Sequence, residues 1–205
     1  WGTKRVQRLY ALHCDLAKIA AGMHTHGLRV HRRRRRWMAW ALAREHEEKR
    51  AKLIEHVGVR GFEGTPDQFR ALIYKRHAVG ERAGLARFNL PDPIDPQMYT
   101  DPKEMDKCSV KEDALIQLLI DPDTPKELSS IIQLYWDAAE VQKMRGTFVS
   151  SKKVLRAIGP DGYMRANWNS CGTKTGRFSC SEPNLMNVPK LLRAMYIASP
   201  GCVLA

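Results

Sequence analysis

The chain has 205 residues, of which 34 are Lys or Arg and 22 are Asp or Glu, so its formal net charge is +12. This length predicts one or two domains, and a content of 43% hydrophobic and 27% charged residues excludes a collagen-like or fully disordered chain. No apolar run reaches the roughly 18 residues of a membrane span, and no signal-peptide pattern opens the chain, so we expect neither membrane insertion nor secretion. Five cysteines without regular spacing favour a reducing compartment, and the positive charge favours an anionic partner.

Positive charge is concentrated towards the two ends of the chain. Residues 1–60 hold 15 basic and 5 acidic side chains, residues 61–137 hold 9 and 14, and residues 138–205 hold 10 and 3. Two basic segments therefore flank an acidic one, and this asymmetry is more informative about a partner than the total charge.

The first 60 residues predict two helices. Residues 4–23 place apolar side chains on one helical stripe, and this helix should end near Gly27, before a short extended turn at 28–30. The second helix is expected over 33–57 and opens on a run of arginines at 32–36. Such a run suits a nucleic-acid arm or a localisation signal, but amphipathic spacing continues past it, so we favour the solvated first turns of a helix.

Three later helices are expected at 66–76, 109–119 and 125–148. Each start matches the capping-box pattern, in which a hydroxyl residue is followed three positions later by Glu or Gln; the hydroxyl residues are Thr65, Ser109 and Thr124. A Pro- and Gly-rich surface loop is expected at 80–107, between the first two of these helices.

After residue 150 the pattern changes from helical to extended. A turn signal at 159–162 precedes an alternating stretch at 163–169, which predicts one strand of a hairpin. The chain begins with Trp1 and stops inside an apolar stretch at 202–205 that resembles an unfinished buried strand, so we expect a piece of a longer protein. The predicted fold class is α+β, with a mainly helical region followed by the first antiparallel strands of a mixed domain.

Residues 173–190 have the clearest chemical character. The segment is poor in hydrophobic residues, rich in short hydrogen-bonding side chains, and punctuated by Lys174, Arg177 and Lys190. Such a loop can hydrogen-bond phosphates and sugars, and its arginine is long enough to enter a groove of a duplex. By composition alone, an ordinary polar surface loop is the favoured interpretation.

The order of the residues in this segment changes that interpretation. Thr175-Gly176-Arg177, Ser179, the Ser-Glu-Pro-Asn-Leu run at 181–185 and the Asn-Val-Pro run at 187–189 resemble the signature Thr-Gly-Arg-Leu-Ser-Ser-x-x-Pro-Asn-Leu-Gln-Asn-Ile-Pro. That signature precedes the catalytic palm motif of family A DNA polymerases, the bacterial DNA polymerase I group. A match of this length with fixed spacing is specific. Met186 replaces the family's Gln, which removes one minor-groove hydrogen bond.

The resemblance extends over nearly the whole chain and implies three regions. They are a helical connecting region at the base of palm and thumb (1–60), a thumb-like helical region (61–150) and the beginning of the palm (151–205). Residues 143–148 would lie near the DNA-facing tip of the thumb, and residues 193–198 would form a palm strand.

The resemblance also implies which side chains contact DNA. Arg177 would lie in the minor groove at the primer terminus, where every base pair presents an acceptor, so that pair shape is checked without reading sequence. Asn184 and Asn187 would hold template or primer nearby. Contacts to the phosphate backbone are expected from Lys143, Arg145, Lys152, Lys153, Lys174, Thr175, Ser179 and Lys190. The linker that leads to Arg193 is shorter than in the bacterial enzymes, so the role of Arg193 stays open.

By the same resemblance, the chain is part of a DNA-directed DNA polymerase whose partners are primer–template DNA and deoxynucleoside triphosphates. The complete enzyme is expected to use two Mg²⁺ ions, whose aspartate ligands lie outside this chain, with the fingers, in a C-terminal polymerase fragment. We therefore expect this chain to hold no catalytic residue, to bind no metal and to be inactive alone. The implied location is the cytoplasm of a bacterial or phage-infected cell.

Other interpretations compete with this one. The alternative function is a non-catalytic, basic, helical nucleic-acid-binding protein that shares only the polar loop. Zinc binding near His24 and His26 is not favoured, because no Cys-x-x-Cys or closely spaced His pair completes a tetrahedral set. Cys171 and Cys180 are interpreted as ordinary buried thiols.

Overall fold

A computed structural model of the chain describes residues 3–74, 78–90, 112–173 and 176–202. The chain divides into two compact units: residues 1–43 with 142–205 form unit 1, and residues 44–141 form unit 2. By sequence, unit 1 holds 20 basic and 3 acidic residues, a net charge of +17, whereas unit 2 holds 14 and 19, a net charge of −5. Two basic segments that are far apart in the sequence thus belong to one unit. The three regions expected with boundaries at 60 and 150 stay a prediction.

Unit 1 begins with α1 (Thr3–His26), which ends where the sequence predicts. Gly27 follows with φ +68°, and its N–H donates to the Met23 carbonyl at 3.1 Å, which closes the last turn. The chain then enters β1 (Leu28–Arg29), which pairs antiparallel with β2 (Tyr163–Met164). A Cβ atom at position 27 would lie 2.6 Å from the Met164 carbonyl oxygen, so this crossing requires glycine.

The apolar stripe predicted for α1 is for the most part not buried. Val6 is 57% exposed, Leu9 51% and Ile19 54%, whereas Ala20 is buried. Among the described elements, α1 packs mainly against β3 (Asn167–Asn169). None of the described helices is both long and apolar enough to span a membrane.

The helix expected over 125–148 is divided in the structure. α6 (Lys126–Met144) begins one residue later than predicted and continues into η4 (Arg145–Val149), a π-helical turn in which Ser150 N donates to the Arg145 carbonyl at 2.9 Å. A π-turn widens the helix by one residue per hydrogen bond, and the chain then restarts as α7 (Lys152–Ala157). Ser151 caps α7, because its side chain accepts a hydrogen bond from Val154 N at 3.1 Å.

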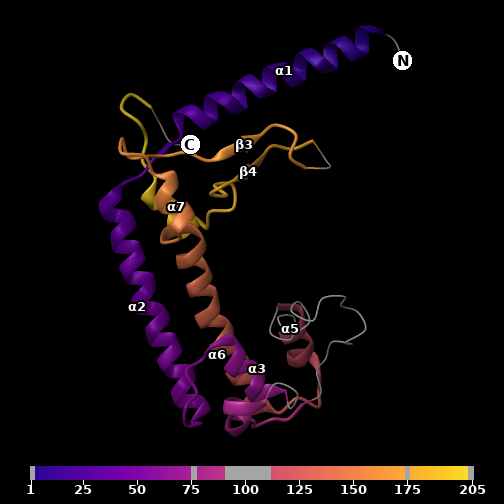
Figure 1. The fold of residues 1–205 in the computed structure, drawn as a ribbon, viewed down its shortest axis with the longest axis vertical. Coiled ribbons are helices and arrows are strands. Elements are labelled where there is room, and N and C mark those ends of the chain that lie inside the picture. Colours follow the sequence, from indigo (N-terminus) through magenta and orange to yellow (C-terminus); the bar gives the residue numbers. More distant parts are fainter. Residues whose placement is uncertain (1–2, 75–77, 91–111, 174–175, 203–205) are drawn as a thin grey trace. The chain divides into compact units, whose positions relative to one another are not determined.

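The strand expected over 163–169 is also divided. Its first two residues form β2, whereas residues 167–169 form β3, which pairs antiparallel with β4 (Ser179–Ser181). Figure 1 shows β3 and β4 lying side by side beneath the end of α1. The palm strand expected over 193–198 is wrong at its start, since residues 190–195 form the 3-10 helix η5 (Lys190–Met195). Extended pairing begins only at Tyr196, which bridges Val30.

Unit 2 is built around α3 (Pro66–Ile73), α5 (Glu112–Ile120), the 3-10 helix η2 (Gly80–Leu85), and parts of α6 and of α2 (Arg32–Val57). The capping box predicted at Thr65 is confirmed, because Gln68 N donates to Thr65 Oγ1 at 3.3 Å and the Gln68 side chain reaches back. α3 ends three residues earlier than predicted, where Tyr74 becomes extended. The predicted start at Ser109 and most of the predicted loop lie outside the described residues.

The core of unit 2 is apolar and continuous. The rings of Phe69 in α3 and Tyr135 in α6 stack with their centroids 3.8 Å apart, and the buried residues around them form one cluster. Leu53 and Val57 of α2 and Leu115 of α5 complete this cluster. The predicted α+β class is confirmed: helices predominate, and unit 1 adds two small antiparallel sheets.

Candidate nucleic-acid interface

All the candidate residues that the structure describes belong to unit 1. A hairpin positions the polar segment: β3 leads into a turn at 170–173, and β4 begins after residue 178. Asn169 pairs with Ser179, and Trp168 pairs with Cys180. Lys174 and Thr175, both expected to contact phosphate, lie outside the described residues.

Thr173 fixes the backbone from which Arg177 projects. Its Oγ1 atom accepts a hydrogen bond from Arg177 N at 2.9 Å and donates to the Arg177 carbonyl at 3.3 Å. Gly176 N donates to the Thr173 carbonyl at 3.0 Å, which closes the turn. The Arg177 side chain is exposed and, among the described residues, its guanidinium makes no hydrogen bond or ion pair. Its backbone is therefore held while its charge is available to a ligand.

Ser179 has a structural position inside the hairpin. A Cβ atom at position 172 would lie 2.7 Å from Ser179 Cβ and would overlap the hydroxyl, so Gly172 permits the Ser179 side chain to lie against the opposite strand. Ser179 is only partly exposed there. Its expected contact with phosphate stays a prediction.

The loop after β4 is anchored by a buried thiol. Cys180 Sγ donates to the Pro183 carbonyl at 3.4 Å and accepts from Leu185 N at 3.4 Å, and burial raises the pKa of the Cys180 thiol. Cys180 is thus a buried thiol as predicted. The same interpretation is wrong for Cys171, which is exposed at the hairpin turn with its Sγ 3.2 Å from His13 Nδ1.

Asn184 and Asn187 are both exposed on this loop. Asn184 Oδ1 accepts a hydrogen bond from Met186 N at 3.1 Å, a local turn that orients the side chain and leaves the amide NH₂ as its donor group. The Asn187 side chain forms no hydrogen bond with another described residue. Their expected contacts with template or primer stay predictions.

The basic residues near the end of α6 are presented in different ways. Lys143 and Lys152 are exposed. Lys153 forms an ion pair with Glu182 of the polar segment, with its Nζ atom 3.4 Å from Glu182 Oε1. This pair is well exposed, so its net contribution to stability is small. Arg145 opens the π-turn and is half-buried, and its Nε has no hydrogen-bond partner among the described residues.

The last two candidates lie on η5. Lys190 is exposed at its first residue. Arg193 is also exposed, but its Nε donates to the Val188 carbonyl at 3.3 Å, so part of the guanidinium is used to hold the turn before η5. The structure therefore assigns Arg193 a local structural contact.

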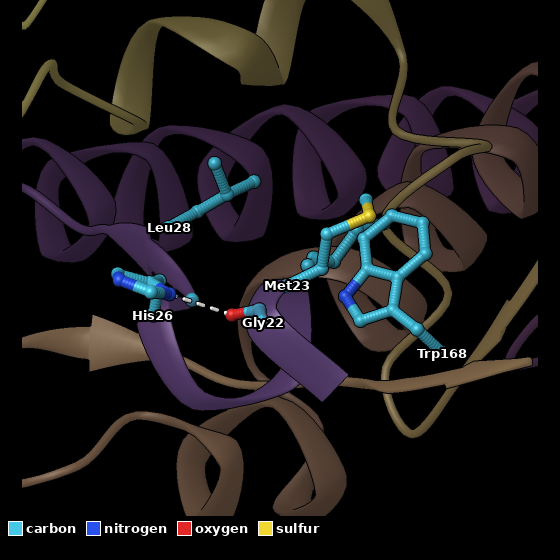
Figure 2. Close-up of a pocket in the computed structure, with 7 residues that line it drawn as sticks. Gly22, Met23, His26, Leu28 and Trp168 are labelled. Atoms are coloured by element: carbon cyan, nitrogen blue, oxygen red, sulfur yellow. Dashed lines mark hydrogen bonds between the residues drawn. The ribbon is translucent and has the colours of Figure 1, made fainter. Parts of the chain in front are cut away.

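An apolar hollow of about 430 Å³ adjoins the polar segment. Figure 2 shows Trp168 of β3 beside Met23 of α1, with His26 and Leu28 at the other side. The His26 ring Nδ1 donates to the Gly22 carbonyl at 2.7 Å, and the His24 ring Nδ1 lies 2.9 Å from the Ala166 carbonyl oxygen. Both imidazoles are thus engaged with backbone, and the hollow has an apolar lining unsuited to phosphate.

The described residues do not fit a Mg²⁺ site. Mg²⁺ is bound through carboxylates, and no three His, Cys, Asp or Glu side chains of the described chain are grouped to hold a metal. By sequence unit 1 has three carboxylates, and each is paired with a base: Asp15 with Lys18 at 3.1 Å, Asp161 with Arg165 at 2.6 Å, and Glu182 with Lys153.

Comparison with known proteins tests the resemblance to family A DNA polymerases. No model of a known protein family matches the chain. A DNA polymerase I of Chloroflexus aurantiacus is 30% identical over 91 residues, which cover 38% of this chain and 9% of that protein. The fold matches the POL domain of Pol1 from M. smegmatis in complex with DNA primer-template and dNTP, with a TM-score of 0.62, 19% identity, and coverage of 91% of this chain and 29% of that one. The resemblance to family A DNA polymerases is confirmed.

The chain matches only a part of each of these two polymerases. The chain spans about a tenth of the length of the curated relative and less than a third of the solved chain. The fold likeness nevertheless covers 91% of the present chain, so both units take part in it. Sequence reasoning missed Thr173 as the residue that fixes Arg177; a hydroxyl four positions before the arginine was the available signal.

Proposed function

We propose that this chain is the part of a DNA-directed DNA polymerase that grips primer–template duplex and contacts the primer terminus through Arg177. One observation carries the proposal. The arginine of the family motif is exposed and makes no ion pair among the described residues, on a backbone fixed by Thr173. The Arg177 guanidinium is therefore available to donate hydrogen bonds to an acceptor on a bound ligand.

The chemistry of the duplex explains how one arginine can contact the primer terminus whatever its sequence. In the minor groove, purine N3 and pyrimidine O2 present acceptors at every base pair, so a guanidinium there can donate to any correctly shaped pair. The net charge of +17 on unit 1 attracts the phosphates on either side, and exposed Lys143, Lys152 and Lys190 are placed to neutralise them. Arg177 then recognises the terminus, and the lysines supply affinity without regard to sequence.

The remaining parts of the enzyme follow from the same proposal. The likeness to polymerases, one of them solved with DNA primer-template and dNTP, supports deoxynucleoside triphosphates and DNA as partners. Because the chain spans less than a third of the solved polymerase chain, the Mg²⁺ ligands are assigned to a further polymerase segment that carries the fingers and the rest of the palm. The chain alone is then inactive, and the cytoplasm is its proposed location.

Primer extension by this chain together with the segment that completes the palm tests the proposal. Arg177→Ala should slow extension about a hundredfold, because the reacting terminus loses its positioning contact, while duplex affinity changes less than threefold. Arg156→Ala is the matched control, since Arg156 is exposed in the same unit on α7 and forms no hydrogen bond or ion pair with another described residue. It should extend primers at the wild-type rate.

Lys143→Ala separates backbone contact from terminus contact. It should weaken duplex binding and reduce the log–log salt slope by about 0.9, with little change in the rate on saturated enzyme. Equal slowing by Lys143→Ala, Arg156→Ala and Arg177→Ala would show that the terminus contact is misplaced. Duplex binding that persists without any extension in the completed protein would favour the non-catalytic nucleic-acid-binding alternative.

A further inference from the structure

The arginines that open α2 have two different roles. Arg32 Nη2 donates to the carbonyls of Gly159 and Pro160 at 3.1 and 2.9 Å, and Arg35 Nη1 donates to the Val149 carbonyl at 2.9 Å. Arg34 Nη1 reaches the Ala194 carbonyl at 3.4 Å. These three arginines bond the helix to backbone carbonyls of unit 1. Arg32 and Arg34 are nevertheless exposed, as expected for solvated first turns, whereas Arg35 is only partly exposed.

Arg33 and Arg36 remain exposed, and neither makes a hydrogen bond or ion pair with another described residue. Trp37 is 63% exposed and Trp40 is 58% exposed. Positions 33, 36, 37 and 40 are spaced by three, four and seven residues, so they share one face of α2. We call these four residues the Arg–Trp face.

The Arg–Trp face carries positive charge where a helix favours negative charge. The first turn of α2 contains no acidic residue, although the N-terminal pole of a helix is itself positive. Desolvation by burial, followed by the charge of neighbouring Arg36, lowers the pKa of Arg35. An anionic ligand at this face would relieve a repulsion that the described part of unit 1 leaves in place.

We propose that the Arg–Trp face binds single-stranded nucleic acid. The exposed indole of Trp37 lies beside the guanidiniums of Arg33 and Arg36, which have no partner among the described residues, so the face can make both contacts that a single strand offers, stacking on bases and charge pairing with phosphates. The face is about 10 Å long from residue 33 to residue 40, which spans about three nucleotides at the 3.4 Å rise of stacked bases. In a duplex the phosphates are accessible but the base faces are stacked inside. An acidic peptide offers negative charge but no aromatic bases on which an indole can stack.

This site uses none of the residues assigned to the primer terminus. The inference therefore goes beyond the proposed function and does not rest on it. Arg177→Ala should leave single-strand affinity within twofold of wild type, so failure at either site is recognised separately.

Fluorescence anisotropy of a labelled 20-nucleotide oligo(dT), titrated with the 205-residue chain over a series of salt concentrations, tests the site. The double variant Arg33→Gln, Arg36→Gln should bind at least tenfold more weakly, with a log–log salt slope shallower by about 1.4, because two single-strand phosphate contacts are lost. Trp37→Leu should bind at least fivefold more weakly with an unchanged slope, because it removes stacking alone.

The double variant Lys52→Gln, Arg60→Gln is the matched control. Both residues are exposed and basic, and the variant removes the same charge from unit 2, at residues that are not part of the Arg–Trp face. It should bind within twofold of wild type. Equal weakening by this control, no effect of Trp37→Leu, or a preference for anionic phospholipid vesicles or oligoglutamate over oligo(dT) would each overturn the proposal. Far-UV circular dichroism checks that each variant is folded. If the arginine variant is not, the binding of Trp37→Leu decides the test.

Discussion

The two units of the chain differ in net charge and in which of them holds the candidate residues. Unit 2 has a continuous apolar core around the Phe69–Tyr135 stack and a net charge of −5. Unit 1 has two two-stranded sheets, a net charge of +17 and all the described candidate residues. Both units have buried apolar side chains, so charge is the clearest difference between them, and the basic unit is the one suited to bind an anion.

Unit 1 combines buried apolar side chains, among them Met164, Leu192 and Met195, with specific polar and backbone contacts. Arg32 donates to carbonyls of the turn before β2 and Arg35 to a carbonyl of η4, and an added side chain at Gly27 or Gly172 would overlap a neighbouring segment. These contacts join segments far apart in the sequence through single groups, so single changes there should act differently from a change in the core of unit 2. Three substitutions sharpen this comparison, from the largest expected effect to the smallest.

Phe69→Ala should have the largest effect, a loss of about 3–5 kcal/mol in the free energy of unfolding, because Phe69 is fully buried against Tyr135. Hydrogen exchange should show lost protection in α3 and the first half of α6. Amides of β3 and β4 should keep theirs, since they belong to unit 1.

Val79→Ala is the control for this change, because Val79 is a 64% exposed apolar residue of unit 2. It should alter the free energy of unfolding by less than about 0.5 kcal/mol. Equal loss of protection in the β3–β4 hairpin of Phe69→Ala would show that the two units unfold as one.

Gly27→Ala should destabilise unit 1 by about 2 kcal/mol, because a non-glycine residue at φ +68° costs about 1–2 kcal/mol and its Cβ would press on the Met164 carbonyl. Gly22→Ala is a control of opposite sign. Gly22 lies inside α1 with no atom within 4 Å of an added Cβ, so alanine should stabilise by about 0.5–1 kcal/mol. Thermal denaturation measures both, and a shift of the same sign would contradict the argument.

The parts of the fold that the sequence predicted are those encoded by neighbouring residues. The stop at Gly27 and the capping box at Thr65 depend on groups a few positions apart, and both are confirmed. The pairing of β1 with β2 joins residues about 135 positions apart, and periodicity carries no information about such a partner. The exposed stripe of α1 has the same cause: periodicity identifies a face but not what covers it.

The candidate site divides in a similar way. The order of residues 175–189 identified Arg177, and its exposure agrees with a role in binding. The sequence could not show that Lys153 pairs with Glu182, or that three of the five arginines at 32–36 bond to backbone carbonyls, because those contacts depend on tertiary structure. The roles assigned to individual DNA contacts stay predictions.

The smallest expected effect concerns Asp161, whose side-chain hydrogen bond from Arg165, followed by one from Tyr163 N, lowers the pKa of the carboxyl to about 2. Because the folded pKa lies below the unfolded value of about 3.9, the carboxylate stabilises the fold above pH 4, and this contribution is lost as the pH falls towards 2. Thermal midpoints measured from pH 7 to pH 2 should therefore show Asp161→Asn below wild type at neutral pH and converging with it in acid. Asp123→Asn, at an exposed carboxylate of unit 2, should match wild type throughout. A difference for Asp161→Asn that persists undiminished at pH 2 would mean that the shape of the turn, and not the charge of the pair, holds β2 beside the end of α1.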